Sequence, residues 1–276
     1  MILALLKLMR LYYALPLAGG FVVIVAYLTG GNVFPIYDKL MLSFLSLVNI
    51  ISAGYVLNDV CDIAVDMVNC PSRVMPTGQI SKKTAIFCSI ILFFIGLILA
   101  AFCNILFLLL AIITVLGLIF YNIYSKRMGI FKDILAAALV TLLYPLAFAF
   151  TDAAQTPRLK SLFIFPIWFF LTTMGYEILK DIRDAKGDSG IRSFFTIDYK
   201  LLSAISRTLI IVAGLIAFLP FFLGYCKSIY LIAAIIAFVL AIFATMTKPE
   251  TAIRYVYMEV LLITLGSMAD LLAFGS

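Results

Sequence analysis

Two short acidic stretches carry most of the chemistry that this sequence can offer. The first runs from Asn58 to Asp66, at the end of a long apolar run that begins near Leu40. A helix turns by about 100° per residue, so its polar members share one face within an arc of roughly 100°: Asn58, Asp59, Asp62 and Asp66. Carboxylates on one face repel each other unless a cation lies among them. Hard oxygen ligands of this kind suit Mg²⁺, which commonly takes one or two carboxylates together with substrate phosphates.

The second acidic stretch lies much later in the chain, from Glu177 to Asp188. On a continued helix its acids fall within about 60° of one another: Glu177, Asp181, Asp184 and Asp188. Gly187 is a residue typical of helix ends, and a helix that stopped there would leave Asp188 off this face. The two stretches together hold seven of the fourteen acids in the chain. The remaining sequence therefore has to bring them together.

Basic and aromatic residues near the acids favour a diphosphate as the ligand. Metal ions bridge diphosphate oxygens, and free basic side chains neutralise the remaining charge. A diphosphate bound by a membrane protein indicates a lipid tail, and the implied reaction is the ionisation of an allylic diphosphate in a dry site. The expected diphosphate-binding residues are Arg10, Arg73, Tyr121, Lys126, Arg127 and Lys180. Each has a plainer alternative, since these bases can set membrane topology or pair with neighbouring acids, and tyrosines can anchor at the interface.

Composition places the chain in the membrane. It is 65% apolar and 12% charged, with a mean hydropathy of +1.18. Repeated apolar runs of about 20 residues are typical of polytopic membrane proteins. We expect one transmembrane domain over residues 1–276, without a linker or soluble domain. The chain has no histidine, which excludes Ser-His-Asp catalysis and His-ligated zinc or haem.

The apolar runs predict an all-α protein with nine membrane-spanning helices around a central cavity. The expected spans are one that runs from about 39 into the first acidic stretch, and 11–29, 84–102, 105–124, 133–150, 162–180, 201–223, 228–246 and 255–274. With the N-terminus in the cytoplasm, sixteen basic residues lie inside and four outside, namely Lys39, Arg158, Lys160 and Lys227. Such an asymmetry is the positive-inside pattern, so the net charge of +6 reflects topology and not nucleic-acid binding. We therefore expect an integral protein of the cell membrane, its C-terminus outside and its cavity and both acidic stretches open to the cytoplasm.

The motifs resemble those of the UbiA-type intramembrane prenyltransferase superfamily. The first acidic stretch matches that family's first motif, and residues 73–81 resemble its following loop, with Val74 in place of the usual proline. Residues 121–127 resemble its middle Tyr/Lys motif, and 181–188 its second acidic motif. The resemblance implies Mg²⁺-dependent transfer of a prenyl group from a prenyl diphosphate to a lipophilic acceptor. It implies metal ligands at Asn58, Asp62, Asp66, Asp181, Asp184 and Asp188, and diphosphate contacts at Arg73, Lys126 and Tyr121.

Within that family, residues 177–188 look most similar to the branch that makes archaeal ether lipids, whose acceptor is geranylgeranylglyceryl phosphate. Arg183 departs from that branch, as does the segment 189–192. An aromatic acceptor of the quinone pathways and terpene cyclisation without an acceptor stay open. A cation transporter is the alternative from another class. The acids lie at span ends and not at the midplane, and bases border them, which disfavours transport. No obligate protein partner is evident.

Overall fold

The computed structural model describes residues 2–150, 157–188 and 198–274, with the side chains of 157–159 and 185–188 excepted. Within these ranges every regular element is a helix, which confirms the all-α prediction. The α-helices are α1 (Ile2–Leu8), α2 (Leu11–Leu28), α3 (Tyr37–Cys61), α4 (Ile63–Asn69), α5 (Lys82–Ala101), α6 (Ile105–Tyr124), α7 (Phe131–Thr141), α8 (Leu143–Phe148), α9 (Phe165–Asp188), α10 (Tyr199–Ile216), α11 (Leu219–Phe222), α12 (Ser228–Met246) and α13 (Pro249–Phe274). Three 3₁₀ turns join them, η1 (Phe34–Ile36), η2 (Ser125–Arg127) and η4 (Pro157–Phe163).

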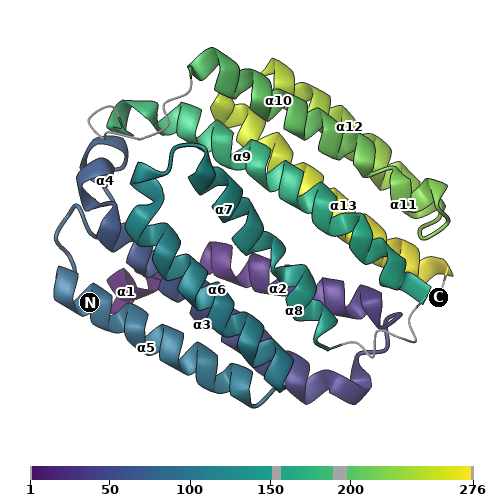
Figure 1. The fold of residues 1–276 in the computed structure, drawn as a ribbon, viewed down its shortest axis with the longest axis horizontal. Coiled ribbons are helices and arrows are strands. Elements are labelled where there is room, and N and C mark those ends of the chain that lie inside the picture. The colour runs from purple at the N-terminus through teal and green to yellow at the C-terminus, as the bar shows by residue number, and fades with distance from the viewer. Residues whose placement is uncertain (1, 151–156, 189–197, 275–276) are drawn as a thin grey trace.

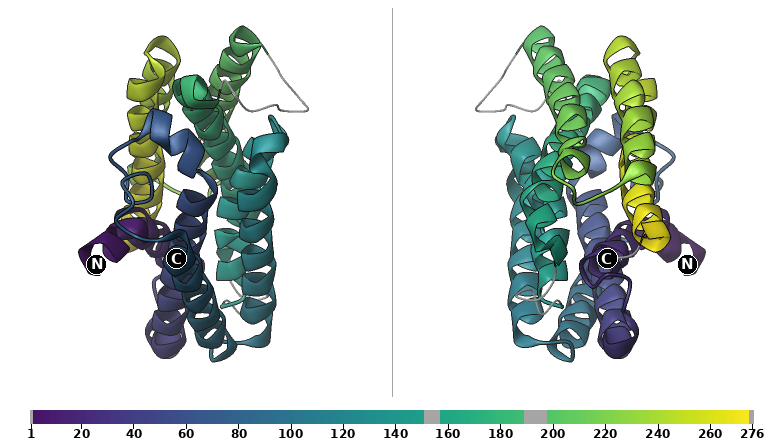
Figure 2. Two further views of the ribbon diagram at one scale, coloured as in Figure 1. Left: turned by 90° about the vertical axis from the view of Figure 1, so that its left-hand side faces the viewer. Right: turned by 90° about the vertical axis from the view of Figure 1, so that its right-hand side faces the viewer.

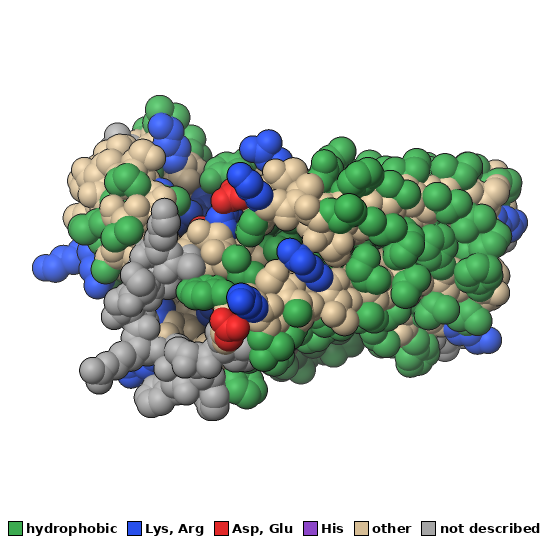
Figure 3. All heavy atoms as spheres, turned by 90° about the horizontal axis from the view of Figure 1, so that it is seen from above, with side chains coloured by type: hydrophobic (Ala, Val, Ile, Leu, Met, Phe, Trp, Pro, Cys, Tyr) green, Lys and Arg blue, Asp and Glu red, His purple; other side chains and the backbone are tan. Residues whose placement is uncertain are grey.

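In the described part of the chain, nine helical stretches are long and apolar enough to cross a membrane. Their outer faces carry large exposed apolar side chains, such as Phe94, Ile113 and Leu261. Figure 3 shows apolar side chains covering the right-hand half of the face that it displays, while most of the charged side chains lie over the other half. A bilayer satisfies such a surface and water does not, so the chain is an integral membrane protein.

The bundle has two halves that are joined through its middle (Figure 1). In one half α3 packs along α5 and α6, and in the other α12 packs along α13 and α10 along α9. Helices α2 and α7 connect the halves, because α2 contacts both α3 and α13 while α7 contacts both α6 and α9. The two ends of the chain lie at opposite ends of the bundle (Figure 1), as an odd number of crossings requires.

Prolines account for most differences from the expected helix boundaries. Residues 133–150 form two helices, α7 and α8, that divide near the expected kink at Pro145. The expected span 201–223 is also divided, because α10 ends at Ile216 and Pro220 lies in the first turn of α11. Helix α13 starts at Pro249, earlier than expected, since proline suits the first turn of a helix.

The same type of contact, a serine hydroxyl bonded to a glycine carbonyl, joins two helix pairs. Ser46 on α3 donates a hydrogen bond to the carbonyl of Gly96 on α5 (2.7 Å), and Ser206 on α10 donates one to the carbonyl of Gly175 on α9 (2.8 Å). A Cβ at either glycine would lie within 3 Å of an isoleucine one turn beyond that serine, Ile50 or Ile210. Small residues thus let each pair of backbones approach closely, as is common inside membranes.

Candidate active site

The first acidic stretch is not one continuous helix face. Helix α3 ends at Cys61 and α4 begins at Ile63, so Asp62 lies at the junction with φ −99° and ψ 8°. Its carboxylate accepts a hydrogen bond from Asn58 Nδ2 (3.0 Å) and lies 2.8 Å from Lys126 Nζ. The expected single face is therefore divided, and the break points Asp62 toward the turn that carries the middle motif.

The other two acids of this stretch are buried and each is paired with arginine. Asp59 is 3% exposed and accepts a hydrogen bond from Arg10, while Asp66 Oδ1 lies 2.6 Å from Arg73 Nη1. Arg73 Nη1 also lies 4.0 Å from Asp59 Oδ1. Burial by itself lowers the pKa of Arg73, but its hydrogen bond to Asp66 and the charge of Asp66 outweigh that effect and raise the pKa. Arg73 is therefore held as a cation against these acids.

Asp66 keeps one oxygen without a partner. Its Oδ2 atom is buried and makes no hydrogen bond within the described residues. A buried carboxylate oxygen without a partner is costly, because it has lost its hydration and received nothing in return. Such an atom is suited to accept a cation.

The second acidic stretch lies on the last turns of α9, and the described acids there also have basic partners. Asp181 Oδ1 lies 2.5 Å from Lys132 Nζ, which comes from α7. Lys180 Nζ lies 2.8 Å from Glu177 Oε2, and Arg183 Nε lies 2.7 Å from Asp184 Oδ1. Helix α9 continues through position 187 to Asp188, whose side chain is outside the described atoms. No three acid or thiol groups of the described residues converge closely enough to hold a metal ion by themselves.

The two stretches meet at one end of the bundle, which faces the viewer in the left view of Figure 2. Asn69 at the end of α4 donates a hydrogen bond to the carbonyl of Asp184 on α9 (3.0 Å). Tyr55 on α3 stands between them, with the Arg10 guanidinium carbon 5.4 Å from its ring centre. Glu177 and Lys180 lie within electrostatic range of the Tyr55 hydroxyl. Acids far apart in sequence are thus parts of one polar region.

Tyr121 and Arg127, which were also expected at the site, differ in how near they lie to the acids. Tyr121 on α6 is half-buried, and its hydroxyl is within electrostatic range of Lys132, Glu177, Lys180 and Asp181. Arg127 is exposed, and no carboxylate of the described residues lies within 4.0 Å of it. The structure therefore brings Tyr121 to the second acidic stretch and leaves Arg127 at the margin.

Sequence reasoning missed Lys132 and Asp133, which begin α7. Lys132 was expected only as a topology charge, yet it contacts Asp181. Asp133 is 2% exposed and lies within electrostatic range of Lys132, Asp181 and Glu177. The available signal was an adjacent base and acid at the start of an apolar span, where a buried charge needs a reason.

Known proteins are similar to this chain along most of its length. The model of the UbiA prenyltransferase family matches residues 17–252. The chain is 35% identical over 218 residues to digeranylgeranylglyceryl phosphate synthase of Saccharolobus solfataricus. The aligned residues cover 77% of this chain and 75% of that protein. It is 30% identical over 218 residues to the enzyme of the same name from Sulfurisphaera tokodaii, which covers 77% of this chain and 76% of that one.

Solved structures show the same fold. A structure of digeranylgeranylglyceryl phosphate synthase matches with a TM-score of 0.76 at 24% identity and covers 99% of both chains. A UbiA homologue from Archaeoglobus fulgidus, bound to DMAPP and Mg²⁺, matches with a TM-score of 0.65 at 17% identity and covers 98% of this chain and 99% of that one.

Proposed function

The chain belongs to the UbiA prenyltransferase family, and on that premise we propose that it transfers a prenyl group from a prenyl diphosphate to geranylgeranylglyceryl phosphate. One observation carries the proposal: two acidic stretches, from α3–α4 and from α9, meet at one end of a membrane bundle, with basic residues paired to their acids. The curated relatives named as digeranylgeranylglyceryl phosphate synthases support this choice of acceptor. The whole of residues 1–276 acts as one catalytic unit.

The donor set fits Mg²⁺ that arrives together with a diphosphate. Mg²⁺ commonly binds through one or two carboxylates and completes its shell with water and phosphate oxygens, so no pre-formed group of three acids is needed. The unpartnered Oδ2 of Asp66 is one such ligand atom. The residues that would hold the ion are Asn58, Asp62, Asp66, Asp181, Asp184 and Asp188. For Asp59, which was expected as a ligand, we propose a different role, because its contacts with Arg10 and Arg73 make it the anchor of two cations.

When bound, Mg²⁺ neutralises charge that develops on the leaving diphosphate. The chain's own cations do the same from fixed positions: Arg73 and Lys126 beside the first stretch, Lys132 and Lys180 beside the second. The bond between C1 of the prenyl group and the diphosphate oxygen breaks, and its electron pair stays on the diphosphate. The acceptor hydroxyl oxygen forms the new bond to C1 and its proton is released. Catalytic roles therefore fall to Asp62, Asp66, Asp181, Arg73 and Lys126, and Arg10 and Tyr121 help to position the diphosphate.

The rest of the bundle accommodates the lipid parts of both substrates and keeps water away. The interior of the bundle contains aromatic side chains, including the mutually packed Phe21, Phe107 and Phe150. A dry site protects an allylic cation from capture by water. We place the N-terminus in the cytoplasm and the C-terminus outside, because the basic residues concentrate at the end that carries the acids.

The test uses purified protein, Mg²⁺ and labelled geranylgeranyl diphosphate, with geranylgeranylglyceryl phosphate or 4-hydroxybenzoate in separate reactions. We expect a labelled product from the glyceryl phosphate alone, and none in excess EDTA. A product from 4-hydroxybenzoate alone would overturn the acceptor. Diphosphate release without either product would indicate a cyclase, and turnover that persists in EDTA would overturn the role of Mg²⁺.

A further inference from the structure

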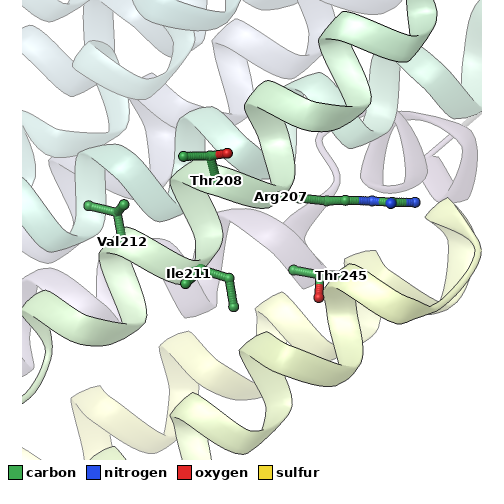
Figure 4. A pocket seen from close by; sticks show the side chains of 5 residues that line it. All are labelled: Arg207, Thr208, Ile211, Val212 and Thr245. Atoms are coloured by element: carbon green, nitrogen blue, oxygen red, sulfur yellow. The ribbon is translucent and has the colours of Figure 1, made fainter.

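A groove on the outer face of the bundle lies away from the acidic region, between α10 and α12. Its volume is about 360 Å³, and Figure 4 shows the side chains that line it: Arg207, Thr208, Ile211, Val212 and Thr245. One wall is apolar, and one end carries the Arg207 guanidinium beside the Thr245 side chain (Figure 4). The groove therefore has the two chemical parts of a lipid, an apolar stretch and a charged end.

Helices α10 and α12 are closely packed beside the groove. A Cβ at Gly214 would lie 2.8 Å from Phe238 and 3.4 Å from Ala241. Ile210 is fully buried and belongs to one apolar cluster with Ala241 and Ala244 of α12. The groove therefore lies between the outer faces of two helices whose inner faces are packed.

The charged end of the groove lies at the level of lipid head groups. Thr245 precedes Met246, the last residue of α12, so this end lies where α12 leaves the membrane. Arg207 lies about 12 Å from the start of α10, because a helix rises 1.5 Å per residue. With Arg207 at the level of the head groups, the first turns of α10 lie outside the apolar layer. The Thr245 hydroxyl donates to the carbonyl of Ile242 (2.7 Å), so its proton is already used, whereas the Arg207 guanidinium is exposed.

Arg207 is a cation that pairs with no carboxylate of the described residues. It is exposed, and no carboxylate in the described ranges lies within 4.0 Å of it, unlike Arg10, Arg73 and Arg183. Basic pockets between spans at this level bind acidic lipid head groups, because a phosphate is at hand there and is only partly hydrated.

From these features we propose that the groove between α10 and α12 binds an anionic phospholipid of the surrounding bilayer, with its phosphate on Arg207 and one chain along Ile211 and Val212. The guanidinium fork matches phosphate oxygens, and a bilayer lipid supplies the chain that covers the apolar wall. The site is separate from the acidic region and does not depend on the reaction proposed above.

The experiment measures the thermal unfolding of the full chain in a neutral detergent with added phosphatidylglycerol, phosphatidylcholine or inorganic phosphate. Phosphatidylglycerol should raise the Tm of the wild-type protein by several degrees, and the other two additions should not. Arg207→Gln should remove most of that rise. Arg254→Gln is the matched control, because Arg254 is also exposed, lies near the same end of the bundle and does not line the groove.

A second variant separates lost binding from lost folding. Val212→Trp keeps the cation but fills the apolar wall, and it should also weaken the response to phosphatidylglycerol while its Tm without lipid stays close to that of the wild type. Equal stabilisation by phosphatidylcholine, or an unchanged response of both variants, would overturn the proposal. A response to inorganic phosphate equal to that of the lipid would show an anion site without a lipid chain, which also overturns it.

Discussion

At the scale of single residues, the acids of the site are held in place by basic partners that the reaction also needs. Asp66 pairs with Arg73 and Asp62 with Lys126, and these same bases can neutralise a diphosphate. Pairing stops the carboxylates from repelling each other before a ligand binds. A substitution of one of these acids therefore has two effects. It removes a candidate ligand atom, and it leaves the charge of the basic partner unpaired.

Replacement of Asp66 by asparagine tests the first acidic stretch. Asp66→Asn removes a charge that both orients Arg73 and offers a buried oxygen to the cation, so we expect kcat to fall by about 100-fold or more. Turnover of labelled prenyl diphosphate measures this loss. Asp38→Asn is the matched control, because Asp38 lies in the first turn of α3, on a different helix from Asp66 and away from the acidic stretches, and is exposed. Full activity in Asp66→Asn protein that unfolds at the wild-type Tm would remove this residue from the site.

Replacement of Lys132 by methionine tests the contact that sequence reasoning missed. Lys132 is the cation that α7 supplies to Asp181, so its loss should raise the KM for prenyl diphosphate by about tenfold, which is 1.4 kcal/mol. Steady-state kinetics at saturating Mg²⁺ give this value. Lys83→Met removes the same charge from an exposed position before α5 enters the membrane, and should leave KM unchanged. Equal KM values in the two variants would show that Lys132 serves only as a topology charge.

At the scale of helices, a serine, an isoleucine and a glycine recur at two interfaces, α3 with α5 and α10 with α9. The glycine carbonyl accepts from the serine and the missing Cβ leaves room for the isoleucine. Because lipid tails are as apolar as the helix faces, close packing and hydrogen bonds replace the hydrophobic effect as the source of stability between spans. Both acidic stretches lie on helices that are fixed in this way.

Gly96→Ala tests this packing without touching the site. The added Cβ would lie 2.6 Å from Ile50 Cγ1 and 3.1 Å from the carbonyl oxygen of Ser46, so α3 and α5 must move apart. Overpacking of this kind typically costs about 1–3 kcal/mol, and the Tm in detergent should fall by several degrees. Gly19→Ala in α2 is the control, since nothing lies within 4 Å of its new Cβ, and its Tm should stay level or rise. Equal Tm changes would contradict the account of close approach.

At the scale of the whole molecule, nine crossings place the two ends of the described chain on opposite sides and the acidic region at one end. Basic residues concentrate at the same end, so the charges that are expected to orient the protein in the membrane also lie beside the acidic region. On the proposed function, the acidic end would face the compartment that holds the charged substrate, because a diphosphate does not cross an apolar layer.

Reporter fusions test the proposed orientation. An alkaline phosphatase domain joined after Lys227 should be active, because that turn is expected outside, and one joined after Lys248 should be inactive. Green fluorescent protein at the same two junctions should give the opposite pattern. The reverse result at both junctions would place the acidic region outside the cell and contradict the proposed orientation.

The sequence by itself determined the class of the molecule and the residues that could do chemistry. Hydropathy and helical spacing are local properties, so they predicted nine spans, with α6 and α12 exact, and acids at the ends of two of them. Only the tertiary structure decided which charges pair. Lys132 with Asp181 and Arg10 with Asp59 are contacts between distant segments, and the break at Asp62 serves a contact with Lys126. Local patterns do not encode such partners, because packing between helices sets which polar faces meet.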